Sequence, residues 1–158
     1  MAHLCGYFIL PSDDIKDYRI KESAAALTTK RHVTVIPTAN LVEGIENPPT
    51  RTKANENQIR NLKLLKKAGV SFGIGTDNYG TDSLKEALHL HKLGVWSNLE
   101  LLKIWCESTP QLIFPNRKIG RLKDGCEASF VVMEKNPLVD FENVQTIRLR
   151  CKQGLVMP

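Results

Sequence analysis

Asp77 follows an apolar run, Val70 to Ile74, in the stretch GVSFGIGTDNYGTDSL that covers residues 69–84. Five strand-like residues in a row predict a buried strand, and the polar, glycine-bearing residues after them predict a loop. In α/β barrels the catalytic acids lie at the C-terminal ends of the strands. Elsewhere an Asp in this position forms a turn or caps the next helix. The local pattern leaves both interpretations of Asp77 open.

The histidines differ in what their surroundings predict. His3 accompanies the apolar opening HLCGYFI and is either a site residue or a core or terminal histidine. His32 begins a β-branched run rather than ending one, which indicates a structural role. His89 and His91 form a His-x-His pair inside an expected helix, where residues two apart point to nearly opposite sides. We therefore reject that pair as a metal site.

Other chemistry is not indicated by spacing. Asp77 and Asp82 share one loop that fixes no geometry for paired-carboxylate chemistry. The sequence contains no GxSxG elbow, GxGxxG fingerprint or P-loop.

The elements that must position these residues alternate between strands and helices. We expect helices at 14–30, 54–68 and from 83 to about 93, strands at the opening HLCGYFI, 32–38 and 70–74, and a long loop at 40–53. Ile59, Leu62, Leu65 and Ala68 form one apolar stripe, and Gly69 is the expected C-cap. Such alternation is typical of the βαβ units of a parallel sheet or barrel.

Two capping-box motifs, and a change in the type of sequence at about Thr109, add to this pattern. Ser83 with Glu86, and Ser97 with Glu100, each predict a helix start. From about Thr109 the sequence is punctuated by Gly and Pro and favours short strands at 131–133 and 146–149. These residues predict a second, β-rich unit.

Composition bounds the class of protein. The chain has 158 residues, 42% hydrophobic and 25% charged, as expected for a folded globular domain. The formal net charge of +5 invites a nucleic-acid hypothesis, but the basic residues are dispersed and lack interleaved aromatic residues. Cys5, Cys106, Cys126 and Cys151 form no CxxC pair and predict reduced, mostly buried thiols. With no signal peptide or apolar run of membrane length, we expect a cytoplasmic protein without nucleic-acid or membrane partners.

Four segments together resemble the C-terminal part of metal-dependent amidohydrolases, in particular the imidazolonepropionase-like group. They are VSFGIGTDNYG, HKLGVWSNLELLKIWCESTP, RKIGRLKDGCEASFVVMEKNPLVDF and IRLRCKQG. The resemblance covers about residues 60–156. It implies an α/β fold made of the last three βα units of a TIM (β/α)₈ barrel in residues 1–108. Residues 109–158 would then form part of a small β-sandwich.

The resemblance also implies a chemistry. Asp77 matches the catalytic acid of the eighth strand, which ligates or approaches a divalent metal, and His3 matches the metal- or substrate-binding histidine of the sixth strand. The implied cofactor is a divalent metal, with zinc expected, and the implied substrate is a small-molecule amide, cyclic amide or dipeptide-like compound. A catalytic zinc needs about three protein ligands, so we expect the chain alone to be inactive. The alternative is a non-catalytic fragment or subunit that self-associates or completes a barrel with a separate N-terminal half.

Overall fold

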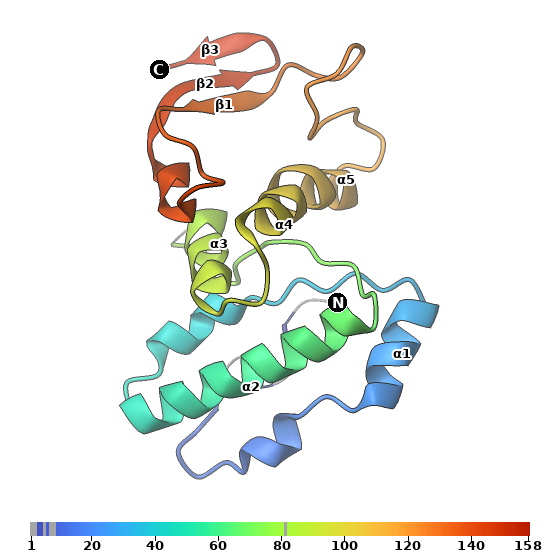
Figure 1. Ribbon diagram of the computed structural model, residues 1–158, viewed down its shortest axis with the longest axis vertical. Coiled ribbons are helices and arrows are strands. Elements are labelled where there is room, and N and C mark those ends of the chain that lie inside the picture. The colour runs from blue at the N-terminus through green and yellow to red at the C-terminus, as the bar shows by residue number, and fades with distance from the viewer. Residues whose placement is uncertain (1–2, 5, 7–8, 81) are drawn as a thin grey trace. The chain divides into compact units, whose positions relative to one another are not determined.

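The computed structural model describes residues 3–4, 6, 9–80 and 82–158 as two compact units, Met1–Val95 and Trp96–Pro158. Each unit is considered by itself. The described residues form a mixture of helices and a small antiparallel sheet (Figure 1). This agrees with the α/β class expected from the sequence. None of the described helices has both the length and the apolar character needed to cross a membrane.

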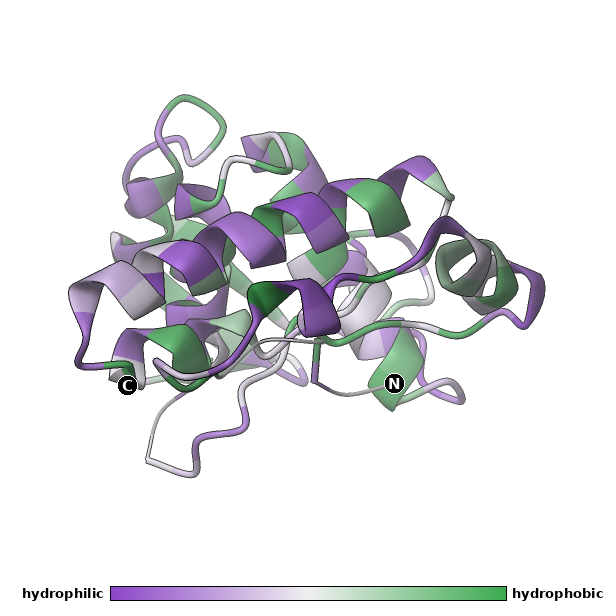
Figure 2. Ribbon diagram, turned by 90° about the horizontal axis from the view of Figure 1, so that it is seen from below, coloured by the Kyte–Doolittle hydropathy of each residue, from purple (hydrophilic) through white to green (hydrophobic). Residues whose placement is uncertain are grey.

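The helices of the first unit agree with the sequence pattern in part. A 3₁₀ helix at Ile15–Tyr18 (η1) and α1 at Glu22–Lys30 replace the single helix expected at 14–30, because the backbone of Arg19 is extended. α3 spans Ser83–Lys92, as expected. Hydrophilic and hydrophobic residues alternate around the helices (Figure 2).

The prediction of a long loop at 40–53 is wrong. A 3₁₀ helix, η2, occupies Ala39–Gly44, and the 20-residue helix α2 begins at Pro48 and ends at Lys67. Asn47 caps α2 by accepting a hydrogen bond from Thr50 N, and prolines occupy its first two positions. Proline suits the first helical turn because the amide it lacks has no partner there. The Asn-Pro-Pro sequence therefore starts a helix instead of forming a loop.

The strands expected at 32–38 and 70–74 do not form at full length; among the described residues Val35 and Phe72 form an isolated parallel bridge. Val35 N donates to Ser71 O at 2.9 Å, and Gly73 N donates to Val35 O at 3.0 Å. His3 N and Leu4 N donate to the carbonyls of Ile36 and Pro37. The segment around residue 35 thus lies between the other two. Cys5, Tyr7 and Phe8 of the opening HLCGYFI lie outside the described residues.

The face that α2 buries is more polar than its apolar stripe indicates. Leu62 and Leu65 are fully buried and Ile59 is half-buried, but Asn57, Gln58 and Asn61 are buried as well. The amides satisfy backbone groups of irregular segments: Asn61 accepts from Ile20 N at 3.0 Å and donates to Tyr18 O at 2.8 Å. Burial of Gln58 and Asn61 costs little because the oxygen and the nitrogen of each side-chain amide have partners.

In the second unit, a long helical stretch precedes the sheet. α4 (Asn98–Lys103) continues through a π-helical turn at Ile104–Ser108 (η3) into α5 (Thr109–Ile113). Ser97 and Glu100 form the capping box that the sequence predicts. Pro110 cannot donate a backbone hydrogen bond, and the neighbouring Thr109 hydroxyl donates to Ile104 O at 2.7 Å. This bond joins residues five apart in sequence, which is the spacing of a π-helical turn.

The sheet has the order β1-β2-β3, with β1 at Phe130–Met133, β2 at Ile147–Lys152 and β3 at Leu155–Met157, all antiparallel (Figure 1). The strands expected at 131–133 and 146–149 correspond to β1 and β2. A 3₁₀ helix at Phe141–Gln145 (η4) precedes β2 and buries Phe141 and Val144.

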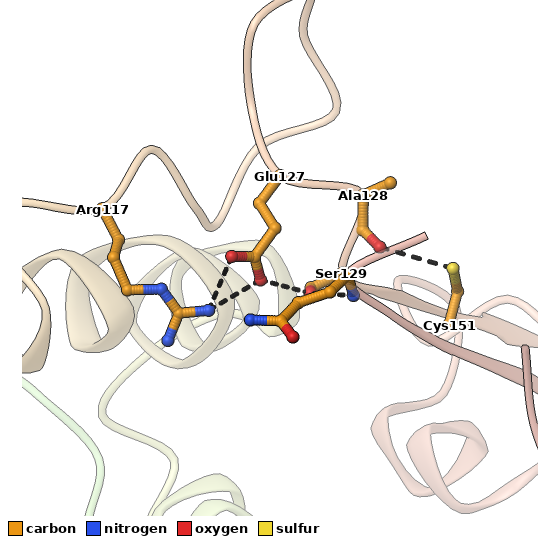
Figure 3. A network of polar contacts seen from close by, with 6 residues as sticks. Arg117, Glu127, Ala128, Ser129 and Cys151 are labelled. Carbon is orange, nitrogen blue, oxygen red and sulfur yellow. Dashed lines mark hydrogen bonds and ion pairs between the residues drawn. The ribbon is translucent and has the colours of Figure 1, made fainter. Parts of the chain in front are cut away.

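Polar contacts close the loop before β1 (Figure 3). Arg117 donates to both carboxylate oxygens of Glu127 at 2.7 Å, and Ser129 Oγ donates to the same carboxylate at 2.6 Å. These bonds, that of Arg117 foremost, lower the pKa of Glu127. Cys151 Sγ donates to Ala128 O at 3.3 Å. Arg117 is therefore held by an ion pair with Glu127 inside the second unit.

The expectation of mostly buried thiols is wrong for the described cysteines. Cys106 is exposed, and Cys126 and Cys151 are half-buried. All three are free thiols. They lie in the second unit: Cys106 in η3, Cys126 in the loop before β1 and Cys151 in β2.

We expect Leu62→Ala to lower the free energy of unfolding by roughly 2–5 kcal/mol, because it leaves a cavity under α2. Leu27→Ala is the matched control, since Leu27 is 53% exposed and should change stability by less than about 0.5 kcal/mol. Urea unfolding followed by circular dichroism measures both. Equal losses in the two variants would contradict the placement of the core.

Candidate functional site

The structure brings together the two residues that the sequence singles out. His3 Nδ1 and Asp77 Oδ2 are 3.8 Å apart, and the side chains are 40% and 47% exposed. The separation is too long for a hydrogen bond, but it places an imidazole and a carboxylate beside each other where both meet water. Their catalytic and metal-binding roles stay predictions.

Backbone pairing explains this proximity. The segments that carry His3 and Asp77 lie on the two sides of the segment at 35–37, through the hydrogen bonds of His3 and Leu4 on one side and of Val35 on the other. Asp77 follows the bridged segment by a few residues, as the sequence predicts. Residues 3 and 77 are thus neighbours through pairing of segments distant in sequence.

The Thr38 hydroxyl lies within hydrogen-bond distance of the His3 ring. Thr38 Oγ1 donates its single hydroxyl proton to Pro37 O at 2.7 Å and lies 3.1 Å from His3 Nδ1. In this arrangement the hydroxyl oxygen accepts from the imidazole, so that Nδ1 carries the hydrogen and Nε2 carries the lone pair. Nε2 is then the nitrogen able to bind a metal or to accept a proton.

The backbone is strained at both of these residues. His3 has φ 68° and Thr38 has φ 51°, in the left-handed region that side-chain-bearing residues rarely adopt. A β-branched residue such as Thr is especially unfavourable there. Strain of this kind persists only where surrounding contacts hold it, and it concentrates at functional sites.

A fully buried carboxylate lies behind this turn. Glu86 accepts from Ala39 N at 2.9 Å and from Asn40 N at 2.8 Å, one bond to each oxygen. Burial raises the pKa of Glu86 to about 7, against the lowering effect of the two amides and with a further rise from Glu43. The capping box predicted for Ser83 and Glu86 is therefore wrong.

The cap of α3 is Asp82, whose side chain accepts from Leu84 N at 2.9 Å. Asp82 thus has a structural role in the loop that it shares with Asp77. Glu86 is drawn away from the helix start because the turn at residues 38–40 presents two amides to it.

A second buried contact holds the other side of the turn. Gln58 Nε2 donates to Ala39 O at 3.0 Å, and Gln58 Oε1 lies 3.1 Å from His89 Nε2. Glu43 Oε1 is 3.4 Å from the other ring nitrogen of His89. Burial lowers the pKa of His89, and the carboxylate of Glu43 opposes that effect. His89 therefore belongs to the buried support of the turn.

Sequence reasoning missed Thr38, Gln58 and Glu86. Thr38 ends the apolar run HVTVIPT, and its position at the end of an expected strand was an available signal. Gln58 lies beside the apolar stripe of α2, and Glu86 fits a capping motif, so nothing local marked either as buried. Their roles depend on a partner segment that lies tens of residues away.

The residues expected to bind a metal can be compared with the ligand set that a zinc site needs. Nowhere in the described ranges do three His, Cys, Asp or Glu side chains gather in a group able to hold an ion. His3 and Asp77 supply an imidazole and a carboxylate, both ordinary ligands of zinc. The two side chains are therefore of types that bind divalent cations, but they are fewer than the roughly three protein ligands of a catalytic zinc site.

We expect the pH dependence of stability to reveal Glu86. Its pKa is raised from 4.5 in the unfolded chain to about 7, so the folded state binds the proton more tightly. The group's contribution is present below pH 4.5 and is lost as the pH rises through 7, by on the order of 3 kcal/mol in total. His89, with its lowered pKa, acts in the opposite direction.

Comparison with Glu86→Gln isolates the carboxyl, because both proteins retain His89. Urea unfolding between pH 4.5 and 8 should show wild-type stability falling relative to the variant as the pH rises. Parallel stability curves over this range would contradict the assignment of a titrating, buried carboxyl at position 86.

Comparisons with known proteins identify the family. The model of the amidohydrolase family matches residues 7–150, whereas the comparison with curated proteins gives no significant match. Similar solved structures include an A. niger ochratoxinase (TM-score 0.72, 22% identity, 86% of this chain and 34% of that one). A Xaa-Pro dipeptidase with bound methionine follows (TM-score 0.69, 21% identity, 87% and 37%).

A putative prolidase from Bifidobacterium longum is also similar (TM-score 0.69, 18% identity, 88% of this chain and 40% of that one). The chain thus spans well under half the length of each of these structures. At such identities the likeness concerns the fold alone. The family match, in contrast, covers most of the sequence, and the chain belongs to the amidohydrolase family.

Proposed function

We propose that this chain contributes Asp77 and His3 to the site of a metal-dependent amidohydrolase that hydrolyses C–N bonds. In this proposal it forms the last three βα units of the barrel and part of a β-sandwich, and it acts on an amide, cyclic amide or dipeptide-like substrate. The observation that carries the proposal is the separation of 3.8 Å between His3 Nδ1 and Asp77 Oδ2, with both side chains accessible to water. A zinc requirement and a cytoplasmic location stay predictions from the sequence.

The family and the fold support the hydrolase at a general level. Amidohydrolases are generally metal-dependent hydrolases, and the family match includes Asp77. The parallel bridge between Val35 and Phe72 agrees with neighbouring barrel strands that precede their site residues. The names of the similar structures, a Xaa-Pro dipeptidase and a prolidase, favour dipeptide-like substrates within the proposed class.

The chemistry assigns separate tasks to the two side chains. A divalent ion, when bound, lowers the pKa of a water molecule toward about 7. Asp77 accepts the proton of the attacking water and passes it to the nitrogen that leaves. His3 presents Nε2, whose lone pair is directed by the Nδ1 bond to Thr38. Partial exposure of both groups allows a substrate to reach them.

We propose further that the chain is inactive alone, because His3 and Asp77 supply two of about three ligands that a catalytic zinc needs. Both compact units fold around their own buried residues, so inactivity would reflect missing ligands and not unfolding. Turnover of simple amides or dipeptides by the purified chain at the rates of barrel enzymes would overturn this proposal.

Zinc binding tests the site directly. We expect isothermal titration to show zinc binding to the wild-type chain, and His3→Gln and Asp77→Asn each to weaken it at least about tenfold, or 1.4 kcal/mol. Asp82→Ser is the matched control, because it removes a carboxylate from the same loop while Ser can still cap α3. Unchanged affinity in both site variants would mean that zinc binds elsewhere and the proposed site is wrong.

A second candidate is a subunit that associates through the residues after Val95. A groove of about 750 Å³ in this unit is lined by apolar side chains from the helices, the loop and the sheet, including Leu102, Ile119, Phe130 and Met133. Leu155 and Val156 on β3 are 71% and 69% exposed, at a strand with one unpaired edge. Exposed apolar strands of this kind favour pairing with another chain.

Size-exclusion chromatography with light scattering tests association. We expect the mass to rise above 17.8 kDa with increasing protein concentration. Val156→Lys should shift the chain back toward the monomer, because a charge on an edge strand opposes pairing. Glu142→Lys is the control for the added charge, on an exposed residue of η4. A monodisperse monomer at all concentrations would contradict this candidate.

A further inference from the structure

We propose that Glu86 is a positioning residue that sets the orientation of the His3 imidazole by holding the backbone of the turn at residues 38–40. The catalytic value of that orientation rests on the proposed function, whereas the coupling between Glu86 and His3 does not. A chain of contacts connects the buried Glu86 to the partly exposed ring of His3.

The first contact is the pair of bonds from the turn to the carboxylate. Glu86 is 0% exposed, and each of its oxygens accepts one of two consecutive backbone amides, Ala39 N and Asn40 N. Hydrogen bonds to a carboxylate are stronger than bonds between neutral groups. Two such bonds to adjacent amides fix both the position and the direction of the peptide that follows Thr38.

The second contact is the strained residue itself. Thr38 is 3% exposed and has φ 51° and ψ 39°. A β-branched residue in the left-handed region relaxes toward an extended or right-handed conformation unless its neighbours are held. Glu86 holds the amides on its C-terminal side, and Gln58 holds the carbonyl of Ala39. The strain is therefore maintained by side chains from α3 and α2.

The third contact transmits the orientation to the ring. Thr38 Oγ1 lies 3.1 Å from His3 Nδ1 and donates to Pro37 O, which leaves it as an acceptor for the imidazole N–H. A change in the φ of Thr38 would swing this oxygen away from the ring. The Nδ1-protonated tautomer would then lose the bond that favours it over the Nε2-protonated one.

The carboxylate at position 86 has both a cost and a gain. A buried carboxylate carries a desolvation cost that an apolar side chain in the core avoids. Its gain here is a pair of acceptors aimed at one turn, which an apolar residue lacks. Outer contacts that orient a histidine are a recurrent feature of metal sites, and His3 is a candidate metal ligand in the proposed function.

The test reads the His3 ring without any activity assay. We expect NMR of the ¹⁵N- and ¹³C-histidine-labelled chain, near pH 8, to show the Nδ1-protonated tautomer for His3, assigned by the loss of its signals in His3→Gln. Glu86→Gln places an amide N–H against the turn's amides and should change the His3 tautomer ratio by at least about twofold. Thr38→Val, which removes the hydroxyl, should produce the same change.

A double-mutant cycle tests the route. If Glu86 acts through Thr38, the Glu86→Gln/Thr38→Val chain should show no further change in the His3 signals than Thr38→Val alone. Asn61→Ala is the matched control, because Asn61 is an equally buried polar residue that bonds residues 18 and 20 and lies outside this chain of contacts. It should destabilise the fold and leave the His3 tautomer unchanged.

The outcomes separate this inference from the proposed function. His3 signals that are unchanged in a folded Glu86→Gln chain, or moved equally by Asn61→Ala, would overturn the coupling. If Glu86→Gln does not fold, Glu86→Asp, which is one methylene shorter and cannot span both amides, takes its place with the same expectation. Zinc added to the same wild-type sample tests the proposed function. If the His3 signals do not respond to zinc, the proposed metal-binding role of His3 is wrong, whereas the coupling between Glu86 and His3 still stands.

Discussion

The first unit depends on satisfying the backbone of irregular segments that are buried. Residues 34–40 carry the strained turn but belong to no full strand, so that their amides and carbonyls lack a regular ladder of partners. An unpaired buried backbone group costs about as much as a lost hydrogen bond. Glu86 and Gln58 supply the missing partners from two helices. The helices therefore support the turn with polar side chains as well as with apolar packing.

This constraint connects the core to the candidate site. The turn held by Glu86 carries Thr38, which bonds His3, and His3 lies beside Asp77 at the end of the neighbouring segment. The side chains of His3 and Asp77 are accessible to water, whereas Thr38, Gln58 and Glu86 are buried. Such a division between an accessible pair and a buried support suits a site that must hold its geometry while remaining open. The amidohydrolase family assignment gives that geometry a chemical context.

Local sequence physics determined much of the fold. Apolar periodicity predicted the C-terminal part of α2, and the Ser97–Glu100 capping box was predicted correctly. The helix α3 was predicted from a Ser83–Glu86 capping motif, although Asp82 forms the cap. Short strand-like stretches between glycines and prolines predicted β1 and β2. The Asn-Pro-Pro start of α2 was misread because proline breaks a helix interior but suits its first turn. The family followed from a combination of motifs, and the family match agrees with it.

Tertiary structure alone decided which residues meet. The sequence pointed to Asp77 and His3 separately, and the pairing of segments brought their side chains within 3.8 Å. Glu86 fits a capping motif by spacing, yet its carboxylate bonds a turn 46 residues away instead of its own helix start. Helix periodicity predicts which face of a helix is buried. The local sequence does not indicate which group a polar residue on that face will bond. Its partner is set by long-range packing, which no short window of sequence contains.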